Sequence, residues 1–362
     1  MYVLKKYQKK IFKSMALVLI TGSCGLVGSE SSVFFAKKGF EILGIDNNSR
    51  KSFFGKDGDI NWVKNKLKKN IKKYKHFNLD IRNFNGLEKI FRKYKKNIKL
   101  IIHSAAQPSH DWAKTNIFKD FDINAKGTIN LLELTKKYCY DSPFIFMSTN
   151  KVYGDNPNKL PLIEKKTRWE IKSNHLYKNG INEKMSIDNC VHSFFGASKS
   201  YADLAVQEYG RNIGLKTVCF RAGCITGPNH SGARLHGFLS YLVKVALERK
   251  KYFIYGYKGK QVRDNIHSAD VVSCFWEYFK KPRKGEIYNM GGGRKSNCSI
   301  IEALKVIESL TNVFTNKELK KENRIGDHIW YISNMNKFKL HYPKWKQIYD
   351  SEKIIDQLLS NS

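Results

Sequence analysis

Residues 20–28 read Ile-Thr-Gly-Ser-Cys-Gly-Leu-Val-Gly; they end the apolar run Ala16–Ile20 and precede a stretch with helical periodicity. This order of strand, glycine turn and helix is typical of a dinucleotide site, because glycine tolerates positive φ and lets the backbone approach a pyrophosphate. The unpaired N–H groups and positive end of the helix then stabilise the phosphate charge. A tight strand-to-helix turn without a ligand could show the same glycines. Asp46 favours the dinucleotide interpretation, because it closes the next apolar run, eighteen residues after Gly28, where a carboxylate can accept hydrogen bonds from a ribose diol.

Short apolar runs alternate with helix-period segments as far as about residue 220, which predicts βαβ units and an α/β fold of Rossmann type with a doubly wound parallel sheet. The expected strands cover 16–20, 41–45, 74–79, 99–103, 143–148 and 215–220, followed by 252–255 and 286–289 in a second lobe. We expect one helix over 116–137. It should pack a single stripe of side chains on the sheet, namely Phe118, Phe121, Ala125, Ile129 and Leu132.

The chain has 362 residues, enough for a nucleotide-binding domain and a smaller substrate lobe. The expected parts are a basic extension over 1–14, an NAD-binding Rossmann domain over 15–220 and a C-terminal α/β lobe over 221–362. A start of translation at Met15 is the alternative to the extension. Residues 154–193 form a long, polar, turn-rich insertion in the Rossmann domain, and long inserted loops are usually functional.

Lysines are spread over nearly the whole chain, so the net charge of +33 indicates a general bias in composition and predicts no nucleic-acid partner. The densest stretch, residues 64–75, has Leu67 and Ile71 among its lysines, as in a solvated helix face. Such a positive surface would still attract a charged nucleotide by electrostatic steering.

The seven cysteines are scattered without a CxxC pair, and His230, His236 and His267 lack metal-ligand spacing. The sequence therefore indicates no metal site and no disulfide framework, and a cytoplasmic location is expected. No apolar run reaches the roughly eighteen residues that a bilayer span needs, so no membrane partner is expected.

Hydroxyl groups gather at the carboxyl end of the predicted strand over 143–148, where Ser148, Thr149 and Tyr153 follow one another. Ligands of open α/β sheets bind at this end of the strands. Further along, Lys199 lies one helical turn beyond Phe195, so both side chains emerge on one helix face.

Several motifs together resemble the extended short-chain dehydrogenase/reductase family. The motifs are the glycine turn, Asp46, Asn78–Ile81, His103–Ala106, Ile123–Thr128, Ser148–Gly154 and Arg263–His267, and the resemblance covers residues 16–345. Within that family, Ser-Thr-Asn-Lys-Val-Tyr-Gly-Asp at 148–155 and Gly-Lys-Gln-Val-Arg-Asp at 259–264 look most like the CDP-paratose 2-epimerases, also called CDP-tyvelose epimerases.

The resemblance implies NAD as cofactor. The residues that would hold it are Gly22, Ser23, Cys24, Gly25, Leu26, Val27, Gly28, Asp46, Asn47, Asp80, Ile81, Ala105, Ala106, Gln107, Asn124 and Lys199. NAD is expected to bind better than NADP, because a 2′-phosphate would meet the carboxylate of Asp46.

The implied substrate is a nucleotide-diphosphate sugar, a CDP-hexose by the closest likeness, whose carbon 2 is oxidised to a ketone and reduced again from the other face. Arg263 and Arg324 match positions that bind the diphosphate in the family, with surface ion pairs as the alternative, and Arg221 at a strand end could also face the cleft. A homodimer or higher homo-oligomer is expected.

Thr149 matches the hydroxyl that bonds the reacting oxygen, and Lys199 matches the lysine of the family's YxxxK motif, but Phe195 stands in place of the motif tyrosine. In relatives, the lysine lowers the pKa of that tyrosine so that its phenolate acts as the base. We expect Tyr153 to substitute, followed by Lys199 itself or His192; Tyr153 as a core ring is the alternative. Two other functions stay open: a dehydratase or oxidoreductase on a related sugar nucleotide, and a catalytically weak protein that binds NAD or a sugar nucleotide.

Overall fold

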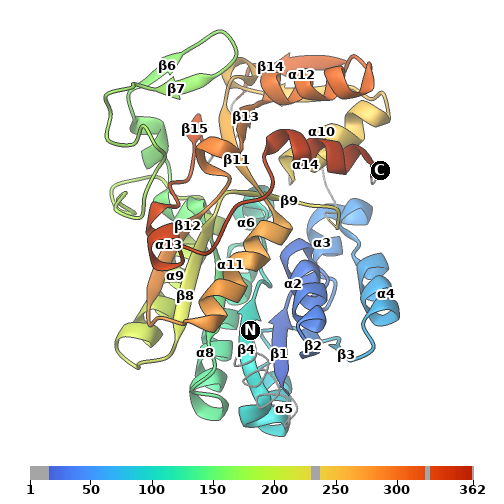
Figure 1. Cartoon of the computed structure of the whole chain (residues 1–362), viewed down its shortest axis with the longest axis vertical. Coiled ribbons are helices and arrows are strands. Elements are labelled where there is room, and N and C mark those ends of the chain that lie inside the picture. The colour runs from blue at the N-terminus through green and yellow to red at the C-terminus, as the bar shows by residue number, and fades with distance from the viewer. Residues whose placement is uncertain (1–15, 230–236, 323–326, 361–362) are drawn as a thin grey trace.

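The central sheet decides the architecture of the molecule. The computed structural model describes residues 16–229, 237–322 and 327–360 (Figure 1). Its seven strands are all parallel and run in the order β12 (Glu286–Met290), β8 (Thr217–Ala222), β5 (Phe144–Thr149), β4 (Ile98–His103), β1 (Leu17–Thr21), β2 (Glu41–Ile45) and β3 (Tyr74–Phe77). The six strands expected in the first 220 residues are confirmed to within two residues at either end.

The strand order reverses beside β1, because β2 and β3 lie on one side of it and β4, β5 and β8 on the other. A crevice forms at such a switch point, outside the carboxyl ends of the strands. Ser104, which follows β4, donates its hydroxyl to the carbonyl of Thr21 at 2.7 Å and so closes the base of this crevice. The glycine turn after β1 and the Ser104–Ala106 loop after β4 therefore face the same space.

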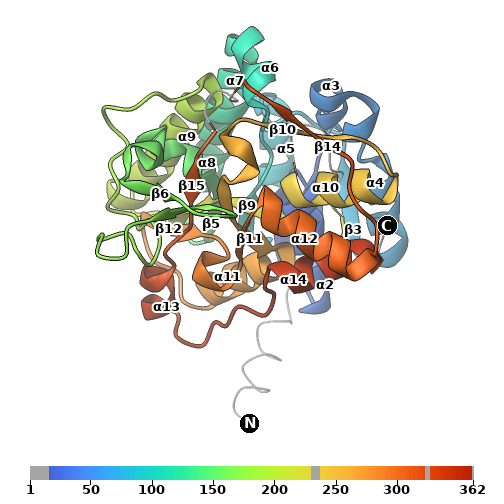
Figure 2. The ribbon, with the colours of Figure 1, turned by 90° about the horizontal axis from the view of Figure 1, so that it is seen from above.

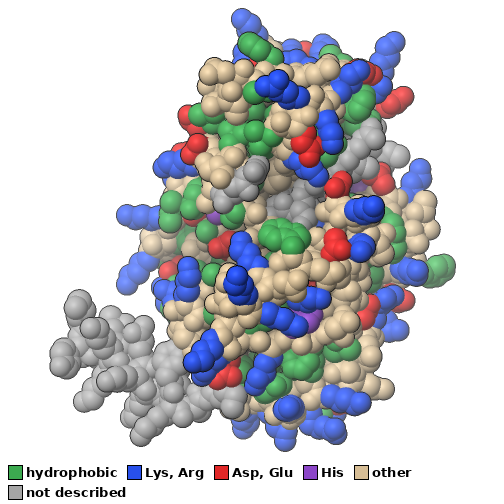
Figure 3. Space-filling model, turned by 90° about the vertical axis from the view of Figure 1, so that its right-hand side faces the viewer, with side chains coloured by type: hydrophobic (Ala, Val, Ile, Leu, Met, Phe, Trp, Pro, Cys, Tyr) green, Lys and Arg blue, Asp and Glu red, His purple; other side chains and the backbone are tan. Residues whose placement is uncertain are grey.

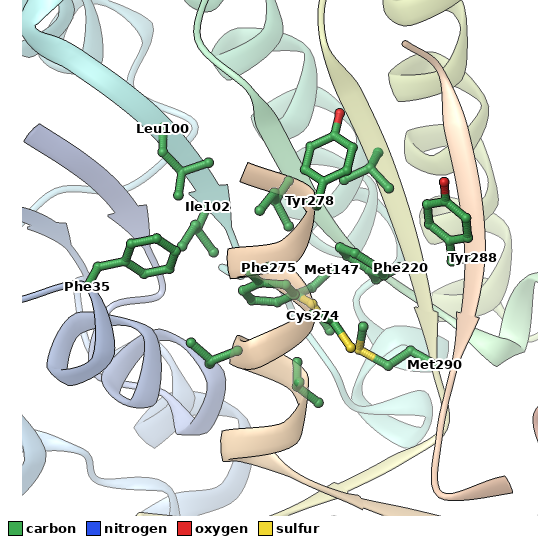
Figure 4. Packing of buried hydrophobic residues seen from close by; sticks show 14 of the residues in the cluster. Phe35, Leu100, Ile102, Met147, Phe220, Cys274, Phe275, Tyr278, Tyr288 and Met290 are labelled. Atoms are coloured by element: carbon green, nitrogen blue, oxygen red, sulfur yellow. The ribbon is translucent and has the colours of Figure 1, made fainter. Parts of the chain in front are cut away.

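Helices cover both faces of the sheet. On one face lie α2 (Leu26–Lys37) and α11 (Ser268–Lys280), and on the other α5 (Phe84–Tyr94), α8 (Gly127–Tyr138) and α9 (Phe194–Arg211). The first face is rich in aromatic rings: Phe220 of β8 packs against Phe275 and Tyr278 of α11 and against Tyr288 of β12 (Figure 4). Burial of these rings on one face, and of the hydrophobic side chains on the other, fixes the sheet as a rigid platform for the crevice.

A smaller lobe lies above the carboxyl ends of the strands, and Figure 2 looks down on it. Its strands are β9 (Cys224–Thr226), β10 (Tyr252–Tyr255), β11 (Val262–His267), β13 (Asn297–Ser299), β14 (Lys317–Lys320) and β15 (Trp330–Tyr331), and its helices are α10 (Phe238–Leu247), α12 (Ile300–Thr311) and α14 (Ser351–Ser360). The three helices pack together with β10 in a core of their own. The remaining helices are α3 (Arg50–Phe54), α4 (Asn61–Asn70), α6 (His110–Thr115), α7 (Ile117–Phe121) and α13 (Asn336–His341).

The boundary between the lobes differs from the expected one at two places. The strand over 286–289 was expected in the second lobe, but as β12 it pairs with β8 and forms the edge of the central sheet. Conversely, the insertion over 154–193 carries the hairpin of β6 (Leu162–Glu164) and β7 (Trp169–Ile171) and packs Ile171 against residues of β15 in the second lobe. Hydrophobic partners far apart in the sequence decide both placements.

The helix expected over 116–137 is interrupted. A π-helical turn over Asp122–Lys126 separates α7 from α8. Because a π turn contains an extra residue, the side chains before it do not continue the stripe that follows it. Ala125 and Leu132 are buried as expected, whereas Phe118 is 89% exposed and Phe121 is 47% exposed, so the prediction of a continuous core stripe was wrong at its first two positions.

Phe118 and Phe121 form part of an apolar surface of α7 and α9, which also includes the exposed Tyr201 and Leu204 of α9. The rings of Phe121 and Tyr201 lie 5.7 Å apart, centroid to centroid. None of the helices over the described residues has the length and apolarity that crossing a bilayer requires.

Candidate active site

A cleft opens at the switch point of the sheet and collects most of the residues that the sequence singles out. The expected site residues that line it are Gly22, Gly25, Leu26, Val27, Gly28, Asp46, Asn47, Asp80, Ile81, Ala105, Ala106, Thr149 and Lys199. Ser23, Cys24, Gln107, Asn124, Tyr153, Arg221 and Arg263 lie outside this lining. Arg324, His230 and His236 lie outside the described residues.

Other lining residues were missed by sequence reasoning, among them Ser49, Arg50, Phe53, Ile60, Ser104, Pro108, Ile225 and Asn229. Ser104 lies within the quoted motif His103–Ala106 and Pro108 lies two residues after it, so both could have been included on that ground. Ile225 and Asn229 come from the segment around β9, where no residue pattern marks a ligand. These two residues reach the cleft because the second lobe packs on the first.

The glycine turn is built so that only glycine fits at two of its positions. Gly22 has φ of 66°, and a Cβ atom on Gly28 would lie 2.0 Å from the carbonyl oxygen of Gly22. Helix α2 begins directly after Gly25, where no side chain caps its first N–H groups. Uncapped N–H groups at a helix start that lines a cleft suit a pyrophosphate.

Asp46 ends the second strand at the rim of the same cleft. Its Oδ2 accepts the Cys24 N–H at 3.0 Å and its Oδ1 accepts the Asn48 N–H at 2.8 Å, so the carboxyl group is fixed against the glycine turn. Burial raises the pKa of Asp46. Both carboxyl oxygens keep further acceptor capacity for a ribose diol. The bare turn and this acceptor together fit NAD.

The opposite end of the cleft lies at the carboxyl end of β5. Thr149 lines it and accepts the Lys151 N–H at 3.2 Å, which starts a 3₁₀ turn over Asn150–Tyr153. Beside it, Ser148 donates its hydroxyl to Asp203 on α9 at 2.5 Å. The strand end and helix α9 are thereby held together under the cleft.

Lys199 also lies at this end, on α9. Its ammonium donates to the Met147 carbonyl at 2.8 Å and lies 4.0 Å from the centroid of the Phe146 ring. Burial lowers the pKa of Lys199 to about 7, against the attraction of Asp203. The lysine is thus fixed by the sheet, with its charge close to its titration point at neutral pH.

Phe195 lines the cleft one turn before Lys199 and is only 7% exposed. The imidazole of His110 packs against its ring in a T-shaped arrangement, with centroids 4.8 Å apart and planes at 67°. His110 Nδ1 lies 2.7 Å from the Ser193 hydroxyl, which also accepts the Gly196 N–H at 3.1 Å and caps α9.

Tyr153 is placed in the core and does not reach the cleft. It is 0% exposed; its hydroxyl donates to Asn289 Oδ1 at 2.7 Å and accepts from Arg221 at 3.2 Å. Burial raises the pKa of Tyr153 to about 12. This placement corrects the expectation that Tyr153 replaces the motif tyrosine and favours the alternative of a core ring.

Arg221 is buried beside Tyr153 and pairs with Asp203 through two hydrogen bonds of 2.7 and 3.1 Å. The fork of its guanidinium is therefore used inside the protein, and the expectation that Arg221 faces the cleft is corrected. Arg263 lies on β11 and pairs with Asp327 at 2.7 Å, while its Nη1 donates to its neighbour's carbonyl.

Gln107 and Asn124 lie behind the cleft wall and bond to each other. The Gln107 N–H donates to Asn124 Oδ1 at 2.9 Å, and both side-chain amides donate to Asp120. Asn124 Nδ2 also lies 3.1 Å from the Ser198 hydroxyl on α9. This network joins the loop after β4 to the helix that carries Phe195 and Lys199.

Comparison with known proteins agrees with this geometry. The sequence profile of the "NAD dependent epimerase/dehydratase family" matches residues 18–291. The CDP-paratose 2-epimerase of Salmonella typhi is 31% identical over 316 residues, which cover 85% of this chain and 89% of that protein. The UDP-glucuronate 4-epimerase of Thermodesulfobacterium geofontis is 28% identical over 312 residues, with 85% and 83% covered.

Among solved structures, the dTDP-glucose 4,6-dehydratase of Bacillus anthracis in complex with NAD superposes with a TM-score of 0.73 at 22% identity, covering 95% of this chain and 96% of that one. At this identity the likeness shows a shared fold.

Proposed function

Because the chain belongs to the NAD dependent epimerase/dehydratase family, we propose that it is a nucleotide-sugar epimerase that inverts carbon 2 of a CDP-hexose. The observation that carries this proposal is the 31% identity to a CDP-paratose 2-epimerase over 85% of the chain. NAD is the cofactor.

When bound, NAD accepts a hydride from the sugar and returns it. The chain's own residues then have separable tasks. The N–H groups that begin α2 bind the pyrophosphate, and Asp46 accepts the ribose hydroxyls. Thr149 and Lys199 both line this end of the cleft. Thr149 would donate its hydroxyl to the sugar oxygen that becomes a carbonyl, and Lys199 would help to hold the cofactor from α9. Inversion then requires that the ketone presents its other face before the hydride returns.

The acidic residues of the cleft favour an epimerase over a dehydratase. A dehydratase needs an acid and base pair close to Thr149, whereas Asn150 and Lys151 follow it here. Within the described part of the chain, the carboxylates that line the cleft are Asp46 and Asp80, which follow β2 and β3 on the other side of the switch point. Such a site supports hydride transfer without elimination of water.

The diphosphate of the substrate is assigned to the second lobe. Arg263 lies on β11, in the lobe that covers the cleft, and its planar guanidinium can bond two phosphate oxygens at once. In this assignment, the substrate's diphosphate replaces Asp327 as the partner of Arg263. Arg324 stays a prediction for the same group.

We also propose that two copies associate through the apolar surface of α7 and α9. Its four exposed side chains come from two adjacent helices, and exposed apolar patches of this kind mark interaction sites. A second copy can bury the same surface about a twofold axis.

The experiment that tests the reaction incubates the purified protein with NAD and CDP-paratose and follows the sugar by proton NMR. An epimer inverted at carbon 2 supports the proposal. In a parallel incubation with CDP-glucose, which keeps its 6-hydroxyl, a 4-keto-6-deoxy sugar would identify a dehydratase instead. Thermal stabilisation by NAD and the CDP-sugar without any product would identify a binding protein, with Phe195 as the cause of its inactivity.

A further inference from the structure

A tyrosine from the edge of the central sheet reaches the glycine turn. Tyr74 is the first residue of β3, the edge strand, yet its hydroxyl lies 2.9 Å from the Oγ of Ser23 in the turn after β1. The intervening strand β2 has Gly44 at the crossing point. A Cβ atom on Gly44 would lie 2.4 Å from the Tyr74 hydroxyl and 2.7 Å from Ser23 Oγ, so the phenol crosses β2 where no side chain stands in its way.

This contact is connected to the groups that face the cofactor. Ser23 is 0% exposed and lies between Cys24 and Gly22, which lines the cleft. The Cys24 N–H donates to Asp46 Oδ2 at 3.0 Å. One chain of contacts therefore leads from Tyr74 through the turn to the carboxylate that is assigned to the ribose diol.

Within the described part of the chain, Tyr74 is the one hydrogen-bond partner that Ser23 Oγ has outside the turn. The other contact of that oxygen, at 3.8 Å, is with the sulfur of its neighbour Cys24. The backbone of the turn is held separately, because the Gly22 N–H donates to the Ile45 carbonyl at 2.8 Å. The position of the Ser23 side chain thus depends on β3, which lies two strands away from β1.

The phenol of Tyr74 keeps its proton near neutral pH. Burial raises the pKa of Tyr74, and burial lowers the pKa of His76, whose Nδ1 lies 3.3 Å from the same hydroxyl, to about 4. Cys24 Sγ lies 3.9 Å from it. A neutral phenol donates one hydrogen bond and accepts others, so it can bond Ser23 and His76 at the same time.

We propose that Tyr74 is a positioning residue for the cofactor: its hydroxyl holds Ser23, and thereby keeps the glycine turn and Asp46 in the arrangement that binds NAD. The inference rests on NAD as the cofactor and on no particular sugar. Loss of the hydroxyl should leave the turn and the Asp46 carboxyl group less fixed. The ribose diol is then bound less well, and a 2′-phosphate is repelled less.

Tyr74→Phe removes the hydroxyl and keeps the ring. We expect it to lower the affinity for NAD by about threefold to tenfold, which is the effect of one hydrogen bond. The affinity for NADP should fall less, so that the preference for NAD narrows. Calorimetric titration of the full chain, freed of bound nucleotide, measures both affinities. Tyr138→Phe is the matched control, because the Tyr138 hydroxyl donates one bond of 2.8 Å to Glu88 and does not line the cleft.

The ratio of the two affinities separates positioning from a general loosening of the fold. A merely structural Tyr74 would change the affinities for NAD and NADP by the same factor. Thermal unfolding without cofactor checks that Tyr74→Phe is folded at the temperature of the titration. An NAD affinity equal to that of the unmodified protein, or an unchanged ratio of the two affinities, would overturn the proposal.

Ser23→Ala removes the other half of the same contact. We expect a similar loss of NAD affinity. The double change of Ser23→Ala with Tyr74→Phe should cost no more affinity than either single change, because both remove one and the same bond. Losses that add up would show that Tyr74 does not act through the turn, and they would also overturn the proposal.

These outcomes are distinct from the outcome for the proposed reaction. A protein that binds NAD but converts no CDP-paratose contradicts the epimerase, and the cofactor titrations still decide the role of Tyr74. Epimerisation together with unchanged NAD affinity in Tyr74→Phe contradicts the role of Tyr74 alone. An unmodified protein without measurable NAD binding would overturn this inference.

Discussion

At the scale of single residues, the replacement of tyrosine by Phe195 changes what Lys199 can do. In the family the lysine lowers the pKa of a tyrosine one helical turn away. In this chain that position holds the phenyl ring of Phe195, which has no proton to lose. The Lys199 ammonium anchors α9 on β5 through the Met147 carbonyl. Under the proposed function the lysine would also help to hold the cofactor.

Phe195→Tyr tests whether the site still accommodates a phenol. We expect this variant to bind NAD as the unmodified protein does and to keep or raise kcat, because Phe195 lines the cleft one helical turn before Lys199. Calorimetric titration with NAD and NMR assay of the CDP-sugar measure the two properties. A loss of NAD affinity would instead show that Phe195 is needed for packing.

The lowered pKa of Lys199 predicts how stability depends on pH. The pKa is about 7 in the folded chain against an ordinary value of 10.5, so between these values the unfolded chain binds a proton that the folded chain does not. Stability of the cofactor-free protein should therefore rise with pH over this window, by about 1 kcal/mol per pH unit from this group.

Lys199→Met should remove that contribution. Urea unfolding of the unmodified protein and of Lys199→Met at several pH values between about 7 and 10 gives the difference between their unfolding free energies at each pH. The change of this difference with pH measures the contribution of Lys199. A difference in unfolding free energy that is constant across the window would contradict the shifted pKa.

Asp46 should decide between the two pyridine cofactors. We expect the unmodified protein to bind NAD at least about tenfold more tightly than NADP, because a 2′-phosphate would lie against a carboxylate. Asp46→Asn should narrow this gap, since it removes the negative charge and leaves Arg50 in the lining of the same cleft. Equal affinities in the unmodified protein, measured by calorimetry, would reject the assignment.

Sequence reasoning located the residues of this site where local motifs specify them. The glycine turn and Asp46 could be predicted because a turn, a strand end and their spacing are local properties. The burial of Tyr153 could not, because it depends on Asn289 of β12 and Arg221 of β8, which only the folded sheet brings together. His110 was missed as a partner of Phe195 for the same reason.

At the scale of elements, the parallel strands were predicted from apolar runs alone, whereas the interrupted helix was not. Apolar residues at three- and four-residue spacing look the same whether they pack on a sheet or on another molecule. Here the π-helical turn over Asp122–Lys126 decides which residues pack on the sheet and which face outward. It turns Phe118 and Phe121 outward, while Ala125 on the same expected stripe stays buried.

The apolar surface of α7 and α9 predicts a dimer in solution. Light scattering coupled to size-exclusion chromatography should give twice the mass of the chain for the unmodified protein. The double change Phe118→Asp with Phe121→Asp should give the monomer, because two charges cannot be buried unpaired in an apolar interface. Phe314→Asp is the matched control, since Phe314 is 87% exposed in the second lobe. A monomeric unmodified protein, or a variant that stays dimeric, would contradict this interface.

At the scale of the whole molecule, two lobes enclose one cleft, and the chain crosses between them several times. The second lobe is built from segments after β8, from the insertion over 154–193 and from the chain end, while β12 returns to the central sheet. The expected division at residue 220 is therefore too simple, because segments that follow one another in the sequence pack in different lobes.

The net charge of +33 is not confined to one segment of the chain. Figure 3 shows Lys and Arg side chains spread over the face it presents, with Asp and Glu side chains among them. Such a distribution agrees with a general bias in composition. It suits attraction of an anionic nucleotide over a long range, with a strength that falls as salt increases.

The measurement that tests the account most directly uses CDP-paratose with deuterium at carbon 2, incubated with the purified protein in ordinary water. Epimerisation through a hydride held on NAD predicts that the inverted sugar keeps its deuterium at carbon 2. An inverted sugar with solvent hydrogen at that carbon would contradict the reaction proposed for this cleft.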